Sequence, residues 1–293
     1  MPETAAKAPT LWLPKRTRAM TVRAKASIGL IGPSGSGKSH GARQLAMDPE
    51  YAGKVLVAMS EDATSTYGED ILSSGALHIA QIRDAEDAKD LLKEIVEAEK
   101  AGKSEFKVIY FDSMSGTGDH EMFRLERNPE LWISDEGKKN AYAKFGKFGL
   151  IFKELQVLAR DYVRADVILT ATTTFPKPGV PPELCIDGRM VPENFTRLTN
   201  VTLYLDAKQM RIWSAGEEPS KDQVEQIKSL KDQSHIEIGR DENGKVDGSY
   251  IVRHVTSKYT GEVAAKGHRS LFLRERADIP MILRKIHGEG DPK

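Results

Sequence analysis

The stretch "SIGLIGPSGSGKSHGARQLA", residues 27–46, decides the fold of this chain. The apolar residues 26–31 predict a short buried strand, and residues 39–47 predict the first turns of a helix. The link between them matches the pattern G-x-x-x-x-G-K-[ST] at Gly32, Gly37, Lys38 and Ser39. This order of strand, loop and helix is the one in which that pattern forms a phosphate-binding loop.

The residue types in the loop suit an anion. Glycine lets the backbone curl until successive N–H groups point inward, and the helix that follows adds N–H groups and the positive end of its dipole. Lys38 is expected to reach the β- and γ-phosphates of a nucleotide, and the Ser39 hydroxyl to hold Mg²⁺. The alternative is a glycine- and serine-rich turn that binds nothing. The predicted nucleotide-binding residues are Gly32, Pro33, Ser34, Gly35, Ser36, Gly37, Lys38, Ser39 and His40.

Length and composition set outer limits. The 293 residues suit one large α/β domain with appendages. Lys and Arg together number 43, as do Asp and Glu, so any surface that attracts nucleic acid must be local. The single cysteine, Cys185, excludes an internal disulfide and fits a cytoplasmic location. We expect neither a signal peptide nor a membrane span, because the apolar runs are too short.

Three regions are predicted along the chain. Residues 1–25 carry many Lys and Arg and predict a solvated basic arm, or an arm that contacts phosphate or a neighbouring subunit. Residues 26–215 form the α/β core. Residues 216–293 predict a helix and a β-hairpin with its turn near Thr260 and Gly261, packed on the core as an extension.

Within the core, predicted strands alternate with stretches of helical periodicity. Strands are expected near 55–59, 108–112, 165–174, 200–207 and 209–216, and helices near 84–102 and 141–162. A polar segment, 113–140, and a proline-rich loop, 175–194, lie between them. This alternation predicts an α/β fold with a mainly parallel central sheet flanked by helices, and ligands at the carboxyl ends of its strands.

Two acidic positions follow predicted strands. Asp112 ends the strand near 108–112, where a carboxylate of the Walker B type helps Ser39 to hold Mg²⁺; the alternative is an aspartate that caps the strand. Glu61 follows the strand near 55–59 and is expected to orient or deprotonate the water that attacks a nucleotide. Asp62 is a rival for that role, and two surface acids are the alternative.

Four segments in this order, "GPSGSGKS", "VLVAMSED", "VIYFDSMSG" and "VILTATTT", resemble the core of the RecA/RadA/KaiC group of ATPases. The resemblance is to the phage-encoded RecA-like ATP-binding proteins, including the Sak-type single-strand annealing recombinases, and covers roughly residues 25–205. It implies a RecA-like P-loop NTPase fold and Mg²⁺-dependent ATP hydrolysis in a homo-oligomeric filament or ring. It also implies single-stranded DNA as partner, a role in phage recombination, and the host cytoplasm as location.

By this resemblance two segments face DNA, one within 113–149 and one at 175–198. Cations that follow phosphates, mixed with aromatic rings that stack on bases, are typical of single-strand binding. The candidate DNA-binding residues are Lys138, Lys139, Tyr142, Lys144 and Lys147 in the first segment, and Lys177, Arg189 and Arg197 in the second. The alternative for the first segment is the buried face of a helix, because Phe145, Phe148 and Phe152 have helical spacing.

The resemblance also implies a cation that a neighbouring subunit inserts toward the γ-phosphate. Lys258 is the first candidate, followed by Arg253 and Arg274. A hydroxyl of the threonines at 172–174, Thr172 first, is expected to sense the γ-phosphate, although threonine is also a common strand former. These threonines replace the usual glutamine or histidine of the group. The acidic segment around Trp132 is an alternative site for a partner protein.

Two other classes of function stay open. One is a non-catalytic module in which the nucleotide controls assembly on DNA or on a partner protein. The other is a P-loop phosphotransferase that acts on a small molecule. The strand and acids of "VLVAMSED", between the loop and Asp112, argue against the phosphotransferase, because they resemble the additional strand of the hydrolysing group.

Overall fold

The computed structural model describes residues 25–62, 64–133, 141–175, 182–188, 190–212, 220–233, 235–240, 246–256, 270–272 and 274–289. Several predictions concern residues outside these ranges: the arm up to residue 24, the hairpin turn near Thr260 and Gly261, and the side chains of Lys138, Lys139, Lys177, Arg189 and Lys258.

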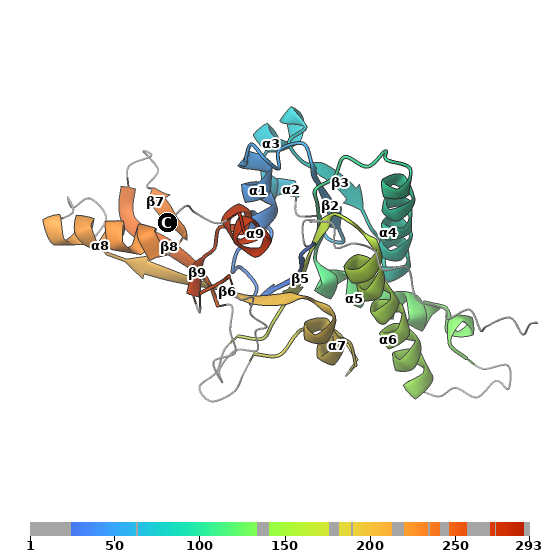
Figure 1. The fold of residues 1–293 in the computed structure, drawn as a ribbon. Coiled ribbons are helices and arrows are strands. Elements are labelled where there is room, and N and C mark those ends of the chain that lie inside the picture. Colours follow the sequence, from blue (N-terminus) through green and yellow to red (C-terminus); the bar gives the residue numbers. More distant parts are fainter. Residues whose placement is uncertain are drawn as a thin grey trace, which may run out of the picture.

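The described strands form one nine-stranded sheet with the order β3-β2-β4-β5-β1-β6-β8-β7, and β9 pairs with β8 (Figure 1). The strands are β1 (Ser27–Gly32), β2 (Val55–Met59), β3 (His78–Gln81), β4 (Val108–Asp112), β5 (Asp166–Thr172), β6 (Val201–Arg211), β7 (His235–Arg240), β8 (Val246–Thr256) and β9 (Arg274–Arg276). The six strands from β3 to β6 run parallel, whereas β8 is antiparallel to β6, β7 and β9. The predicted α/β fold with a mostly parallel sheet is confirmed.

Helices cover both faces of the parallel part. The helices of the core are α1 (His40–Met47), α2 (Thr64–Tyr67), α3 (Glu69–Ser74), α4 (Ala85–Lys100), α5 (Met114–Arg127), the 3₁₀ turn η1 (Pro129–Leu131), α6 (Ala141–Val157), the π-helical turn η2 (Leu158–Tyr162), α7 (Met190–Leu198) and α9 (Ile279–His287). Helix α8 (Lys221–Gln233) instead lies beside the antiparallel strands β7 and β9. Side chains alternate along each strand, so Phe111 of β4 packs in the core with α4 to α7, and Tyr110 packs in the core with α1, α2, α3 and α9. The sheet is thus the middle of three layers.

Strand order brings particular ends together. In the parallel sheet, β5 lies between β1 and β4, and β2 lies on the other side of β4. The register pairs Gly32 with Thr172 and Met59 with Asp112. The carboxyl ends of β1, β5, β4 and β2 are therefore neighbours at one edge, as expected for a parallel sheet with ligands at that edge.

Three expectations about local structure were wrong. The polar segment 113–140 contains helix α5, whose Met114, Met122 and Leu125 are buried on one face, so tertiary packing outweighs the low helix propensity of "SMSGTG". The loop predicted at 175–194 already contains the first residues of α7, which buries Phe195. Within the described residues, the two strands predicted at 200–207 and 209–216 are replaced by one continuous strand, β6, which ends at Arg211 and pairs with β8.

The C-terminal segment returns to the start of the core. Helix α9 packs on α1, as Figure 1 shows, and Gln44 of α1 donates to the carbonyl of Ala277 and accepts from the N–H of Ile279. The first strand of the predicted hairpin lies in β8, which pairs with the preceding strand β7 and with β9; the predicted turn and second strand lie outside the described residues. None of the described helices is both long and apolar enough to cross a bilayer.

We expect Phe148→Ala to lower the free energy of unfolding by about 3–5 kcal/mol, because this fully buried ring packs on Phe152 with ring centroids 4.7 Å apart. Phe145→Ala on the same helix is the matched control. Its ring is 43% exposed, and we expect a loss of less than about 1 kcal/mol. Denaturant unfolding of both variants measures the difference; equal losses would contradict the assignment of Phe148 to the core.

Candidate functional site

The glycine-rich loop joins β1 to α1 and is folded tightly. Its backbone is closed by bonds from Ser36 N–H to the Pro33 carbonyl (3.2 Å) and from His40 N–H to the Gly37 carbonyl (3.1 Å). Gly37 has φ +96°, a conformation that favours glycine. A Cβ on Gly32 would lie 2.3 Å from the Leu205 carbonyl oxygen, so β6 also requires glycine there.

Lys38 is buried within this loop. Its ammonium group donates to the carbonyls of Gly32 and Pro33, both at 2.9 Å. Burial lowers the pKa of this group to about 8, and the acidic groups of Asp112, Cys185 and Glu61 oppose the shift. The loop thus holds a positive charge at the carboxyl ends of the strands, close to acidic side chains. The positive charge suits an anionic ligand, and the acidic side chains suit a cation bound together with that ligand.

Asp112, the last residue of β4, is buried and oriented by two hydroxyls. Tyr67 O–H donates to Oδ2 at 2.6 Å, and Thr170 O–H donates to Oδ1 at 3.3 Å. Burial, followed by the charge of Asp112, raises the pKa of Tyr67, so the phenol keeps its proton. Sequence reasoning missed Tyr67, because the short helix α2 that carries it has no clear periodicity.

These groups surround one pocket of about 470 Å³. Its lining comprises Ser34, Gly35, Gly37, Lys38, Ser39, His40, Glu61, Thr66, Asp112, Ser113, Thr172 and Arg253. The remaining predicted loop residues do not line the pocket but bind residues that do. The Gly32 and Pro33 carbonyls accept from the Lys38 ammonium, and the Ser36 carbonyl accepts from Arg253 Nε. The carboxyl ends of four parallel strands, β1, β2, β4 and β5, therefore contribute to a single site, together with Arg253 of β8.

Glu61 lies at the entrance to α5. Ser113 O–H is 3.5 Å from its Oε1, and a Cβ on Gly116 would lie 2.2 Å from the same oxygen. Gly116 therefore permits the carboxylate to approach the helix closely. Asp62, the rival acid, instead accepts from the backbone and side chain of Thr64 and does not line the pocket. The geometry favours Glu61.

Of the three threonines at 172–174, only Thr172, the last residue of β5, lines the pocket. Its N–H donates to Ser115 Oγ at 2.9 Å, and its carbonyl accepts from Cys185 N–H at 2.8 Å. Thr173 and Thr174 are used for pairing with residues 183–184. Residues 183–185, within the proline-rich segment, thus return to the site and bring Cys185 near Lys38.

The described DNA-binding candidates lie away from this pocket. On α6, Tyr142 is 84% exposed, whereas Lys144 pairs with Glu126 of α5 at 2.8 Å and places its ammonium 5.3 Å from the centroid of the Phe145 ring. Lys147 is half-buried on the same helix, and Arg197 is exposed at the end of α7. The basic and aromatic stretch therefore splits between the core, which takes Phe148 and Phe152, and the surface.

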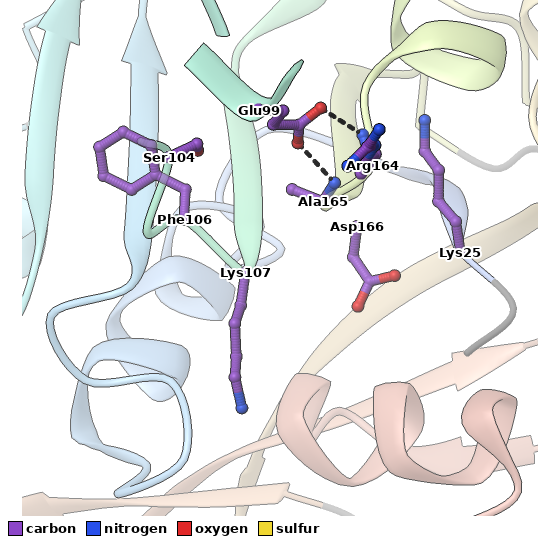
Figure 2. A pocket seen from close by; sticks show the side chains of 8 residues that line it. All are labelled: Lys25, Glu99, Ser104, Phe106, Lys107, Arg164, Ala165 and Asp166. Carbon is purple, nitrogen blue, oxygen red and sulfur yellow. Dashed lines mark hydrogen bonds between the residues drawn. The ribbon is translucent and has the colours of Figure 1, made fainter. Parts of the chain in front are cut away.

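A second pocket, of about 350 Å³, lies at the opposite edge of the sheet (Figure 2). Two of its charged groups already have partners: Lys107 pairs with Glu50, and the Glu99 carboxylate accepts from the backbone N–H groups of Arg164 and Ala165. Figure 2 shows Lys25 and Lys107 pointing in opposite directions. Because the cations of this second pocket do not point toward a common centre, the pocket at the carboxyl ends of the strands is the better candidate for the functional site.

We expect Tyr67→Phe to lower the free energy of unfolding by about 1.5–3 kcal/mol, since it removes a hydrogen bond to a buried carboxylate. Tyr142→Phe, at an exposed tyrosine, is the control and should stay within about 0.5 kcal/mol of the parent protein. Denaturant unfolding at neutral pH measures both. If Tyr67→Phe left the free energy of unfolding unchanged, the hydrogen bond from Tyr67 to Asp112 would not stabilise the fold.

Comparison with models of known protein families and with curated proteins gives no match for this chain, so its site is interpreted from its own residues.

Proposed function

We propose that the protein binds ATP with Mg²⁺ in the pocket at the carboxyl edge and hydrolyses it. One observation carries the proposal: Lys38, Asp112 and Glu61 belong to segments after three different strands, yet they line one pocket with the glycine-rich loop. Backbone N–H groups of such a loop and a helix N-terminus favour phosphate. The buried ammonium adds the charge that a triphosphate requires.

The residues fit Mg²⁺. Ser39 occupies the N-cap position of α1, but its side chain makes no capping bond, and it lines the pocket with Asp112. Mg²⁺ commonly takes one or two protein oxygens together with phosphate oxygens and water. When bound, it would neutralise charge on the phosphates, with Ser39 as ligand and the oriented Asp112 carboxylate holding its water.

Glu61 and Thr172 supply the remaining roles. In the proposed reaction the Glu61 carboxylate orients the attacking water and accepts its proton. The position of Glu61 after β2, directly beside β4, supports this role, because β4 carries Asp112. Thr172 touches the terminal phosphate, and its carbonyl links the site to the segment that contains Cys185.

The partner we propose is single-stranded DNA, bound by a homo-oligomer of a RecA-like protein. The order of the four quoted motifs supports the RecA-like assignment, as does β5 between β1 and β4, with a second acid after β2. Tyr142 and Phe145 on the surface of α6, with Lys144 and Lys147 beside them, supply the rings and cations that sequence-tolerant binding requires.

The test is the ATPase rate with and without single-stranded DNA. We expect DNA to raise the rate, Lys38→Ala to abolish turnover, and Glu61→Gln to keep nucleotide binding while it lowers turnover about a hundredfold or more. Turnover that ignores DNA would refute the partner. A Glu61→Gln variant with full turnover would refute its role, and a parent protein that binds ATP without turnover would favour the non-catalytic assembly module.

The affinity for ATP should fall at high pH. Because the free Lys38 pKa is about 8 and bound phosphate favours its charged form, binding takes up a proton above pH 8. The Kd should already be about twofold above its low-pH limit at pH 8 and should rise toward tenfold per pH unit above about pH 9. Lys38→Arg, whose guanidinium does not titrate in this range, is the control. Calorimetric titration measures Kd; a parent curve that stays flat to pH 9.5 would contradict the assignment.

A further inference from the structure

Arg253 reaches the glycine-rich loop from the antiparallel part of the sheet. It lies on β8, opposite Ala207 of β6 and His235 of β7. Its side chain is buried, and Nε donates to the Ser36 carbonyl at 3.1 Å. The contact is made within one chain, whereas the sequence analysis considered this arginine only as a cation from a neighbouring subunit.

The guanidinium crosses the loop at Gly37. A Cβ at this position would lie 2.5 Å from Nε and 3.2 Å from Cζ of Arg253. Gly37 is thus required twice, for its positive φ and for the space that Arg253 occupies. Arg253 lines the same pocket as Lys38 and Glu61.

The chemistry of the two cations differs. The Lys38 ammonium is a point charge that already binds two loop carbonyls. A guanidinium is planar, permanently charged, and suited to paired hydrogen bonds with phosphate oxygens. Because Nε is anchored on the Ser36 carbonyl, the plane of the Arg253 fork has a fixed orientation at the pocket wall.

We propose that Arg253 contacts the terminal phosphate of a nucleoside triphosphate bound to its own chain, and so distinguishes triphosphate from diphosphate. The inference rests on the proposed function, because it assigns a further residue to the same nucleotide site. Because β8 pairs with β6, β7 and β9, this contact would also connect the nucleotide site to those three strands.

A purely structural role is the competing explanation, in which Arg253 only supports the loop. Arg253→Gln separates the two, because its amide N–H can still donate to the Ser36 carbonyl while the charge is lost. Arg253→Lys keeps the charge and loses the fork. Lys208→Gln, at an exposed lysine on β6, removes the same charge from the neighbouring strand and is the matched control.

The deciding measurement is the Kd for ATP and for ADP, each with Mg²⁺, by calorimetric titration. We expect Arg253→Gln to weaken ATP binding about tenfold or more and to change ADP binding by less than about twofold. Arg253→Lys should fall between it and the parent protein, and Lys208→Gln should match the parent. Equal losses for ATP and ADP, or no loss, would overturn the inference. A parent protein that binds neither nucleotide would refute the proposed function instead.

Mixing variants tests whether the arginine acts within its own chain. In a mixture of Arg253→Gln and Lys38→Ala proteins, the chain with an intact loop lacks its own arginine, and the other chain lacks its lysine. We expect ATP turnover no higher than the sum of the two separate proteins. Recovery of turnover in the mixture would overturn the inference, because it would show that a neighbouring chain supplies Arg253.

Discussion

The buried ammonium of Lys38 is the constraint on which the site depends. Removing this charge from water is costly, and the structure offsets the cost with two loop carbonyls and with the negative charge of Asp112. Asp112 is in turn held by the hydroxyls of Tyr67 and Thr170. The cation, its loop and the end of β4 therefore form one connected polar network above an apolar sheet.

This polar network depends on segments that lie far from the glycine-rich loop in the sequence. Tyr110 of β4 donates its hydroxyl to the Lys38 carbonyl, and α9 packs against the helix that follows the loop. Arg253 ties the antiparallel strands to the same loop through the Ser36 carbonyl. Hydrogen bonds therefore join the glycine-rich loop both to core strand β4 and to β8.

Much of the sheet and half of the site could be predicted from the sequence. The apolar runs at 55–59 and 108–112 and the loop motif depend on short-range patterns, and they placed Lys38, Asp112 and Glu61 after the right strands. Helix α5 was missed because its glycines have low helix propensity, whereas packing against β5, α4 and α6 favours it. Tyr67 was missed for a similar reason, since its short helix has no periodicity of its own.

The sequence by itself determined where the glycine-rich loop lies and which acidic residues follow the apolar runs along the chain. These features depend only on the spacing of residues close together in sequence. Only the tertiary structure decided which residues meet. It placed Glu61 and Thr172, but neither Asp62 nor Thr173, on the wall of the pocket. It also buried Phe148 while exposing Phe145, and it brought Arg253 onto the glycine-rich loop of the same chain. The physical reason is that strand order and register, which set these neighbours, arise from contacts between residues far apart in the chain.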